Sequence, residues 1–234
     1  MSMFAAGGTS MLRRAALGTA GVVALGLTGR HQAVSLSSTP SDAALGALWG
    51  EAIDGMIDVP GAAELSQDGV LYLAPVGSAG TPPRPVKWPR LIGKSVVYSL
   101  TGWNPMGRDA PHEQNVAANQ RLEADLVGWK GNPSPRAWWH SFGFNEKEGW
   151  REEGFSVAFA PEERQFARQS MQKLAYKYRQ AAIYAYRVDR DGVLLREVVW
   201  TNEQKHGRSP EEPMQVLTQP PRSKLAGRRA GDEG

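Results

Sequence analysis

Several separated polar motifs in the middle of the chain carry residue types that bind or react with small molecules. Amide, hydroxyl and indole groups hold a ligand by hydrogen bonds, and a carboxyl group in a pocket can reach a pKa suited to acid–base work. The candidate ligand-binding residues are Thr101, Asn104, Asn115, Asn119, Trp150, Glu152 and Gln180. Glu153 and His112 are the candidate catalytic acid or base.

The elements that must position these motifs follow from hydrophobic patterning. Strict alternation predicts strands, and apolar residues three or four apart predict helices. The expected order is strand 95–101, helix 113–129, strands 137–144 and 155–159, helix 161–178, and strands 181–188 and 193–200. This order predicts an α+β, ferredoxin-like β-α-β-β-α-β fold: an antiparallel sheet, two helices on one face and an extra C-terminal strand.

In that topology the polar motifs converge on one edge of the sheet. The first helix begins where the first strand ends, and the turn between strands two and three lies at the same edge. Asn115 and Asn119 are four residues apart and therefore share a helix face. Free N–H groups at a helix start favour an anion. We therefore expect a pocket for a small anionic ligand, or a protein contact, at this edge.

Four of the motifs also resemble a known family. They are Thr101-Gly-Trp-Asn-Pro105, Asn115-x-x-x-Asn119-x-x-Leu122, Gly149-Trp-x-Glu-Glu-Gly-Phe155, and Gln180 before an apolar strand. Over about residues 96–186 the chain is similar to the bacterial family "domain of unknown function 3293". The resemblance implies a shared fold and no established activity. One departure is that the family usually has Phe-Gly-Gln where this chain has Tyr178-Arg179-Gln180.

The same residues also have structural interpretations. Asn104 and Asn115 can cap and brace the loop between the first strand and the first helix, because Asn-Pro turns and Asn caps are common. Glu152 and Glu153 can be a solvated strand entrance, and Gln180 can be a buried amide that holds the edge together.

Three classes of function remain open. The first is a binding or regulatory module that uses the polar edge around Asn104, Asn119, Glu153 and Gln180. The second is an enzyme with Glu153 or His112 as general acid or base, although no Ser-His-Asp, phosphate-loop or metal signature supports it. The third is an RNA-binding domain, which Glu153 disfavours because the RNA-recognition motif needs a basic residue at that position.

Composition narrows the chemistry further. The chain has no cysteine, which excludes disulfides, thiolate nucleophiles and cysteine-ligated metals. Its four histidines are scattered without ligand spacing, so we expect no metal and no cofactor. A formal charge of +3 comes from arginines near both ends, and the middle is not the basic patch of a nucleic-acid binder.

The N-terminal residues 1–40 predict a targeting leader. They contain no Asp or Glu, and Arg13-Arg14 precedes an apolar run that ends at Leu27 and is too short for a stable membrane span. A plastid (chloroplast) transit peptide, with a twin-arginine address to the thylakoid lumen, is the favoured interpretation. A mitochondrial address and bacterial-type export are the alternatives.

The remaining segments flank the α+β domain at 95–202. Residues 41–94 are expected to form a helix over 41–59, a strand over 69–75 and a proline-rich arm. Residues 203–234 are polar and proline-rich and predict a disordered tail.

Overall fold

The computed structural model describes residues 46, 49–66, 68–77 and 86–229. Their strands are β1 (Ile53–Ile57), β2 (Val70–Pro75), β3 (Val96–Thr101), β4 (Ala137–Asn145), β5 (Trp150–Phe159), β6 (Ala182–Val188), β7 (Leu194–Trp200) and β8 (Glu211–Val216). The helices are α2 (Arg90–Gly93), α3 (His112–Val127), α4 (Arg164–Lys177) and α5 (Glu203–His206). Short 3-10 helices cover Ala63–Leu65, Pro105–Gly107 and Pro161–Glu163.

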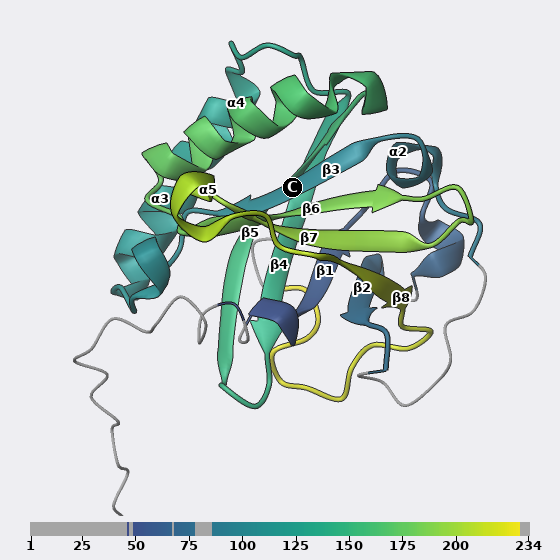
Figure 1. Cartoon of the computed structure of the whole chain (residues 1–234). Coiled ribbons are helices and arrows are strands. Elements are labelled where there is room, and N and C mark those ends of the chain that lie inside the picture. The colour runs from purple at the N-terminus through teal and green to yellow at the C-terminus, as the bar shows by residue number, and fades with distance from the viewer. Residues whose placement is uncertain (1–45, 47–48, 67, 78–85, 230–234) are drawn as a thin grey trace, which may run out of the picture. The chain divides into compact units, whose positions relative to one another are not determined.

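The strands form a closed antiparallel barrel. Its order is β1-β2-β8-β7-β6-β3-β5-β4, and β4 pairs with β1 to complete the ring. Ser99 lies opposite Ser156 between β3 and β5, and Gly55 lies opposite Phe142 between β1 and β4. In Figure 1 the strands cross one another at the centre of the view, with α3 and α4 on the outside.

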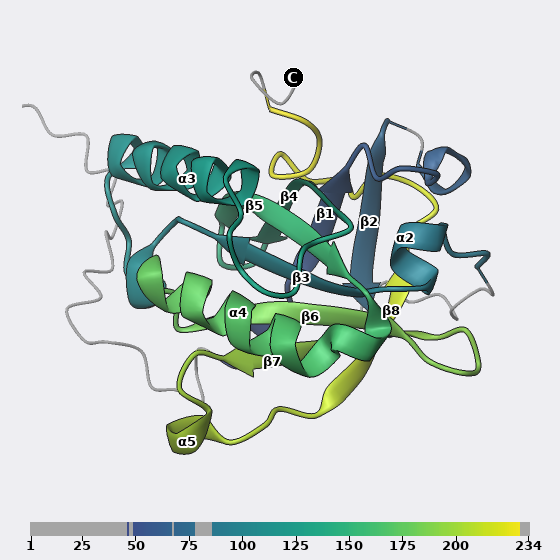
Figure 2. The same ribbon diagram turned by 90° about the horizontal axis from the view of Figure 1, so that it is seen from above.

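The outer face of β3, β5 and β6 is covered by the two long helices. Alternate residues of β3 and β5, such as Tyr98 and Phe159, pack there against Leu122 of α3 and Met171 of α4. The period of two sends the intervening residues, such as Ser99, into the barrel. Figure 2 shows α3 and α4 lying on the same side of the barrel.

The barrel interior is divided into an apolar part and a polar part. One end is filled by an apolar cluster that includes Met56, Leu71, Val97 and Leu194, and Ile92 of α2 packs onto it. The opposite end is where β3 and β7 finish and where β5 and β6 begin, and it holds a cavity lined by polar side chains. We call this polar end the mouth of the barrel.

The predicted ferredoxin-like α+β fold is wrong, because the sheet is a closed eight-stranded barrel and not an open sheet with one covered face. The elements expected between residues 95 and 200 do occur in the predicted order. The sheet does not end at them, however: β1 pairs with β4 at one edge, and β8 pairs with β7 at the other. With β2 joining β1 to β8, no free edge is left.

The helix expected over residues 41–59 is wrong for Ile53–Ile57, which forms strand β1, while residues 46, 49 and 50 of the same segment are helical. Met56 faces the interior cluster, while Ile57 packs on the outer side with Phe142. That alternation, with β-branched residues at both ends of the strand, suits a sheet better than a glycine-interrupted helix. Gly55 lies directly against the Phe142 ring, where a Cβ atom would come within 2.2 Å of the ring.

The prediction of a disordered tail after residue 202 is likewise wrong for residues 203–229, which the structure describes. They contain α5 and β8, so the barrel extends beyond the predicted domain of residues 95–202 in both directions. Beyond β8, Leu225 packs on the outer cluster of Tyr72 and Phe142. The guanidinium of Arg151 donates to the backbone carbonyls of Leu225 and Gly227 at 2.7 and 2.6 Å, which fixes this segment on the barrel.

The predicted leader, residues 1–40, lies outside the described residues. In the part of the chain that the structure describes, no helix combines the length and the apolar character needed to cross a bilayer.

Candidate functional site

The loop between β3 and α3 is held by a reciprocal pair of asparagines. The Asn104 N–H donates to Asn115 Oδ1 at 3.0 Å, and Asn115 Nδ2 donates to Asn104 Oδ1 at 3.0 Å. Ala110 N–H adds a 3.2 Å bond to the same Asn104 oxygen. Asn104 has a left-handed backbone with φ of 45°, a conformation that asparagine adopts more easily than most residues. The sequence therefore places at this turn a residue that suits the backbone and also ties the loop together.

A second asparagine of α3 fixes the start of the same loop. Asn119 Oδ1 accepts the Gly102 N–H at 2.9 Å. A Cβ atom at Gly102 would come within 2.8 to 3.0 Å of the α3 backbone at residues 118 and 119, so only glycine permits this close approach. Asn115 and Asn119 thus position the loop, and neither lines the cavity at the mouth.

The cavity at the mouth has a volume of about 80 Å³. β1 contributes Asp54, and the β3 end contributes Ser99, Thr101 and, from the loop, Asn104. The rest of the lining comes from three more strands: Ser141 and Gly143 of β4, Trp150 and Glu152 of β5, and Gln180 and Tyr184 at the start of β6. Met56 of the apolar cluster is also part of the lining. Trp49, which precedes β1, also lines it.

Glu152 is a cavity carboxyl group whose pKa lies near neutral pH. Burial, with a smaller contribution from the nearby Asp109, raises its pKa to about 7, although the hydrogen bond that Asn104 Nδ2 donates to Glu152 Oε1 at 2.9 Å lowers it. Among the described residues, no ion pair to Glu152 is formed. A carboxyl group that is half ionised near neutral pH can bind a cation or exchange a proton.

The other cavity carboxylate, Asp54, belongs to a buried charge network. Arg196 is fully buried and forms an ion pair with Asp54 Oδ2 at 2.7 Å and with Glu212 Oε1 at 2.7 Å. Its guanidinium carbon also lies 4.7 Å from the centre of the Tyr184 ring. Burial raises the pKa of Tyr184, so its hydroxyl stays neutral and donates to the Trp49 carbonyl at 2.9 Å.

The structure thus brings five of the seven predicted binding residues to the cavity: Thr101, Asn104, Trp150, Glu152 and Gln180. Several of them also brace the loop. Thr101 Oγ1 accepts the Trp103 N–H at 2.9 Å, and Gln180 Nε2 donates to the Trp103 carbonyl at 2.8 Å. These side chains therefore brace the loop, as the structural interpretation expects, and they also line the cavity.

The two predicted catalytic candidates do not line the cavity. Glu153 follows Glu152 in β5 and points to the other face, where its carboxylate pairs with Arg151 at 2.6 Å and Arg229 at 3.0 Å. His112 is exposed at the first residue of α3, and its ring contacts Trp103 edge-on at 5.6 Å. The acid–base candidate in the cavity is instead Glu152.

An RNA-recognition fold would need exposed aromatic side chains in β5, the strand that contains Glu153. Phe155 and Phe159 are 2% and 0% exposed beneath α3 and α4. Neither ring is accessible for stacking on a base, which is how that fold holds RNA.

Sequence reasoning missed Asp54, Tyr184, Arg196 and Trp49. Asp54 lies within the apolar run Ile53-Asp-Gly-Met-Ile57, and a lone acid inside such a run was the available signal for a buried charge partner. Arg196 gives the matching signal in Leu194-Leu-Arg-Glu-Val-Val-Trp200.

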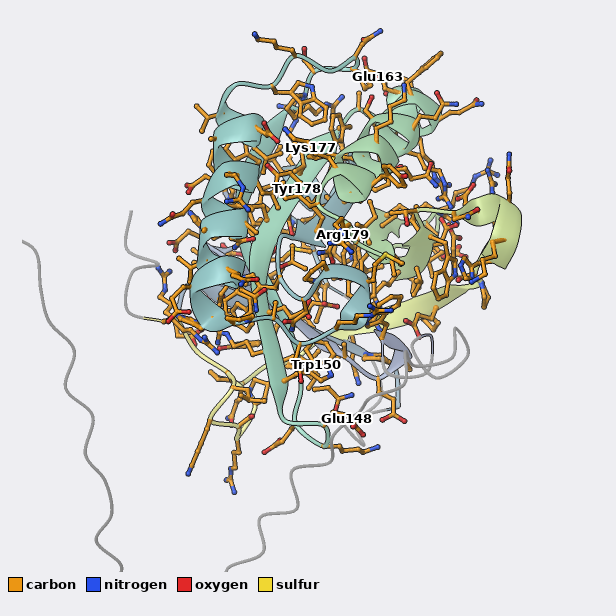
Figure 3. All side chains as sticks on the ribbon, turned by 90° about the vertical axis from the view of Figure 1, so that its left-hand side faces the viewer. Glu148, Trp150, Glu163, Lys177, Tyr178 and Arg179 are labelled. Atoms are coloured by element: carbon orange, nitrogen blue, oxygen red, sulfur yellow. The ribbon has the colours of Figure 1, made fainter. Side chains whose placement is uncertain are left out.

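A second hollow lies outside the barrel, between α3 and the end of α4. Its volume is about 450 Å³, and Arg121, Lys177 and Arg179 bring positive charge to it. Lys177, Tyr178 and Arg179 are labelled in Figure 3, above Trp150 in that view. Lys177 pairs with Asp125 at 2.5 Å, and Tyr178 donates to the same carboxylate, so part of this charge is already neutralised.

Arg179 lies where the resembling family usually has glycine, and its backbone is left-handed with φ of 56°. The N–H groups of Gln180 and Arg179 donate to the carbonyls of Ala175 and Tyr176, which is the Schellman ending of a helix. The departure from the family therefore changes the side chain at this turn, while the backbone has the conformation that glycine favours.

Removing the Asn104 side chain tests this loop. We expect Asn104→Ala to lower the free energy of unfolding by about 3 kcal/mol, because Asn115 Nδ2 and the Ala110 N–H lose the oxygen that both donate to and alanine is strained at positive φ. Asn104→Gly removes the same bonds without the backbone strain, so it should lose about 1 kcal/mol less. Urea denaturation measures both. Equal stability of wild type and Asn104→Ala would contradict the asparagine pairing.

Comparison with known proteins bears on the same segment. No curated protein and no solved structure matches the chain. A family model does match, and its span begins at the end of β3 and reaches the start of β6, so it includes Asn104, Asn119, Glu152 and Gln180. The resemblance seen in the motifs is therefore confirmed: residues 100–183 match the family described as "Protein of unknown function (DUF3293)".

Proposed function

We propose that this protein is a small-ligand-binding module whose site is the cavity at the mouth of the barrel. The observation that carries the proposal is the division of the interior: apolar side chains fill one end, while the other end keeps a cavity lined by polar and aromatic groups. Barrel mouths are common positions for ligand sites, and such sites combine apolar walls with a few placed polar groups.

The rigidity of the cavity wall supports the same function. Asn104, which contributes an amide to the cavity, is fixed from behind by Asn115 and by the Ala110 N–H. Met106, two residues later, also has a positive φ of 57°. Left-handed backbone at non-glycine residues costs free energy and is concentrated at functional sites. A wall held in place before binding reduces the ordering cost of binding.

The outer surface supports a protein partner less well. The large exposed apolar side chains among the described residues include Val127 on α3 and Phe166 and Tyr176 on α4. Phe166 and Tyr176 are ten positions apart on α4, and Val127 is the last residue of α3. They are therefore separate exposed side chains and not one contiguous apolar patch, and isolated exposed apolar residues are common on protein surfaces. The cavity is therefore the more specific feature.

Filling the cavity is the direct test of the proposal. Gly143 lines the cavity, and a Cβ atom there would lie 3.5 Å from Asp54 Oδ1 and 3.7 Å from the Trp150 ring, which are ordinary contact distances. We expect Gly143→Leu to fill the cavity and to abolish ligand binding while stability changes by about 1 kcal/mol or less. A thermal-shift screen of amines, sugars, nucleotides and organic acids measures binding, since a ligand at 100 times its Kd adds about 2.7 kcal/mol.

Gly143→Ala is the matched control, because it makes the same backbone change and leaves most of the cavity open. A compound that binds the site should stabilise wild type and Gly143→Ala, and it should not stabilise Gly143→Leu. If the compounds that bind wild type stabilise Gly143→Leu equally, the mouth is not the binding site. If none of the compounds binds wild type, the proposal is overturned.

A further inference from the structure

The charges that line the cavity are all of one sign. The lining contains two carboxylates, Asp54 and Glu152, and no lysine, arginine or histidine. Asp109, in the loop above, is close enough to raise the pKa of Glu152 and is exposed. Because Arg196 offsets the charge of Asp54, the excess negative charge at the cavity comes from Glu152 when it is ionised and from Asp109.

Only one of the two lining carboxylates already has a counter-charge. Asp54 is paired with Arg196, which also pairs with Glu212 of β8. Glu152 accepts a hydrogen bond from the neutral amide of Asn104, and among the described residues it has no ion pair. An anion placed beside Glu152 would meet like charge, whereas a cation would complete the pair.

The walls of the cavity suit the organic part of such a cation. Trp49, Trp150 and Tyr184 all line it, and a ring face attracts a cation within about 6 Å. The Tyr184 ring already makes this contact with Arg196. Glu152 is near enough to Tyr184 to raise the pKa of its hydroxyl. Carboxylate and ring therefore lie within reach of one small molecule.

Resting on the function proposed above, we propose that the ligand is a small organic cation, a protonated amine or a quaternary ammonium, whose charge pairs with Glu152 and whose alkyl groups contact Trp150 and Tyr184. A metal ion suits the site less well. Calcium and magnesium take six or more oxygen ligands, and in the described part of the chain no group of three or more His, Asp or Glu residues is arranged to hold a metal.

The experiment compares small organic cations with a neutral molecule of similar shape and with an anion. Choline and tetramethylammonium are the cations, 3,3-dimethyl-1-butanol is the neutral isostere of choline, and acetate is the anion. Each is titrated into the full-length protein while tryptophan fluorescence and Tm are followed, because Trp49 and Trp150 line the site. At pH 8 we expect saturable binding of at least one cation and none of acetate, with the alcohol at least about tenfold weaker than choline.

The pH dependence gives a second readout. The groups facing Glu152 are Asn104 and Asp109 from the loop, Tyr184, and the Asp54–Arg196 pair. Because the pKa of Glu152 is about 7, the carboxyl is mostly ionised at pH 8 and mostly protonated at pH 6. Cation affinity should therefore fall about tenfold between pH 8 and pH 6, the reverse of what an anion would show.

Glu152→Gln removes the charge and keeps an oxygen that can accept from Asn104. It should bind choline at least about tenfold more weakly at pH 8, and the pH dependence should disappear. Its Tm at pH 8 should be equal to or higher than that of wild type. In wild type the pKa of Glu152 is raised in the folded state, so the folded protein loses stability as the pH rises and the buried carboxyl ionises. The control is Glu148→Gln, an exposed glutamate in the β4–β5 turn, which should bind as wild type does.

The outcomes separate this inference from the proposed function. If the neutral alcohol or acetate binds as well as the cations and Gly143→Leu abolishes that binding, the cavity is a ligand site and the cation inference is wrong. Choline binding that Glu152→Gln leaves unchanged also overturns the inference. If neither these probes nor the screened compounds bind wild type, both conclusions are overturned.

Discussion

Replacing Arg196 by methionine is expected to lower the free energy of unfolding by about 3–5 kcal/mol. The guanidinium is fully buried, and it pairs with Asp54 and Glu212. It also donates to three backbone carbonyls in the segment before β1, those of Trp49, Gly50 and Ala52. Methionine has similar bulk but donates no hydrogen bond, so Asp54 stays buried without its counter-charge. Urea denaturation at pH 7.5 measures the loss.

Arg187→Met is the matched control. Arg187 lies in the adjacent strand β6, is about one-third exposed, and pairs with Glu211 of β8. An ion pair at such a position contributes about 1 kcal/mol or less. A double variant, Arg196→Met with Asp54→Leu, should recover part of the lost stability, because no uncompensated buried charge remains. If Arg196→Met and Arg187→Met cost the same, Arg196 does not join β7 to the segment before β1.

The convergence of the site could be predicted from short-range connections. Thr101 ends β3, Glu152 begins β5 and Gln180 precedes β6, and β3 pairs directly with both β5 and β6. These relationships depend on local turns and on helices that join neighbouring strands, and the order of the elements is enough to infer them. They remain valid in the barrel because closure adds strands at the far edges without reordering these three.

The direction in which the Glu152 and Glu153 side chains point could not be predicted from the order of the helices and strands alone. Glu152 and Glu153 are adjacent in a strand, so one faces the interior and the other faces outward. Which of them faces inward depends on register, and the register places Glu152 beside Gly143 and Glu153 beside Phe142. Phe142 belongs to the outer cluster, so its partner Glu153 is also outside. A shift by one residue would have exchanged the two roles.

Closure of the barrel could not be inferred because β8 resembles a loop in sequence. The strand reads Glu211-Glu-Pro-Met-Gln-Val216, with two acids and a proline. Its acids are partners for arginines of neighbouring strands, Glu212 for Arg196 and Glu211 for Arg187, and Met214 packs in the interior cluster. Such long-range ion pairs have no local signal in the sequence, and the polar composition of the segment by itself predicts disorder.

The largest effect is expected for the isolated segment 95–202, which the sequence suggested as a domain. We expect it not to fold, because it lacks β1, β2 and β8. Without them, β4 and β7 keep unpaired edges, and interior side chains such as Val97, Trp139 and Leu194 lose the packing of Met56, Leu71 and Met214. Each buried side chain of this size contributes about 1.5–3 kcal/mol, and a domain has only about 5–15 kcal/mol in total.

The measurement is a circular dichroism melt of segment 95–202 beside segment 46–234, which retains every strand of the barrel. The longer segment should unfold in one cooperative transition. The shorter one should show no cooperative transition, no near-ultraviolet signal from its tryptophans, and binding of a dye that reports exposed apolar surface. A cooperative transition in segment 95–202 with a near-ultraviolet spectrum would mean that an open sheet is stable alone. The strands β3 to β7 would then fold without β1, and Asp54 would be dispensable for their folding.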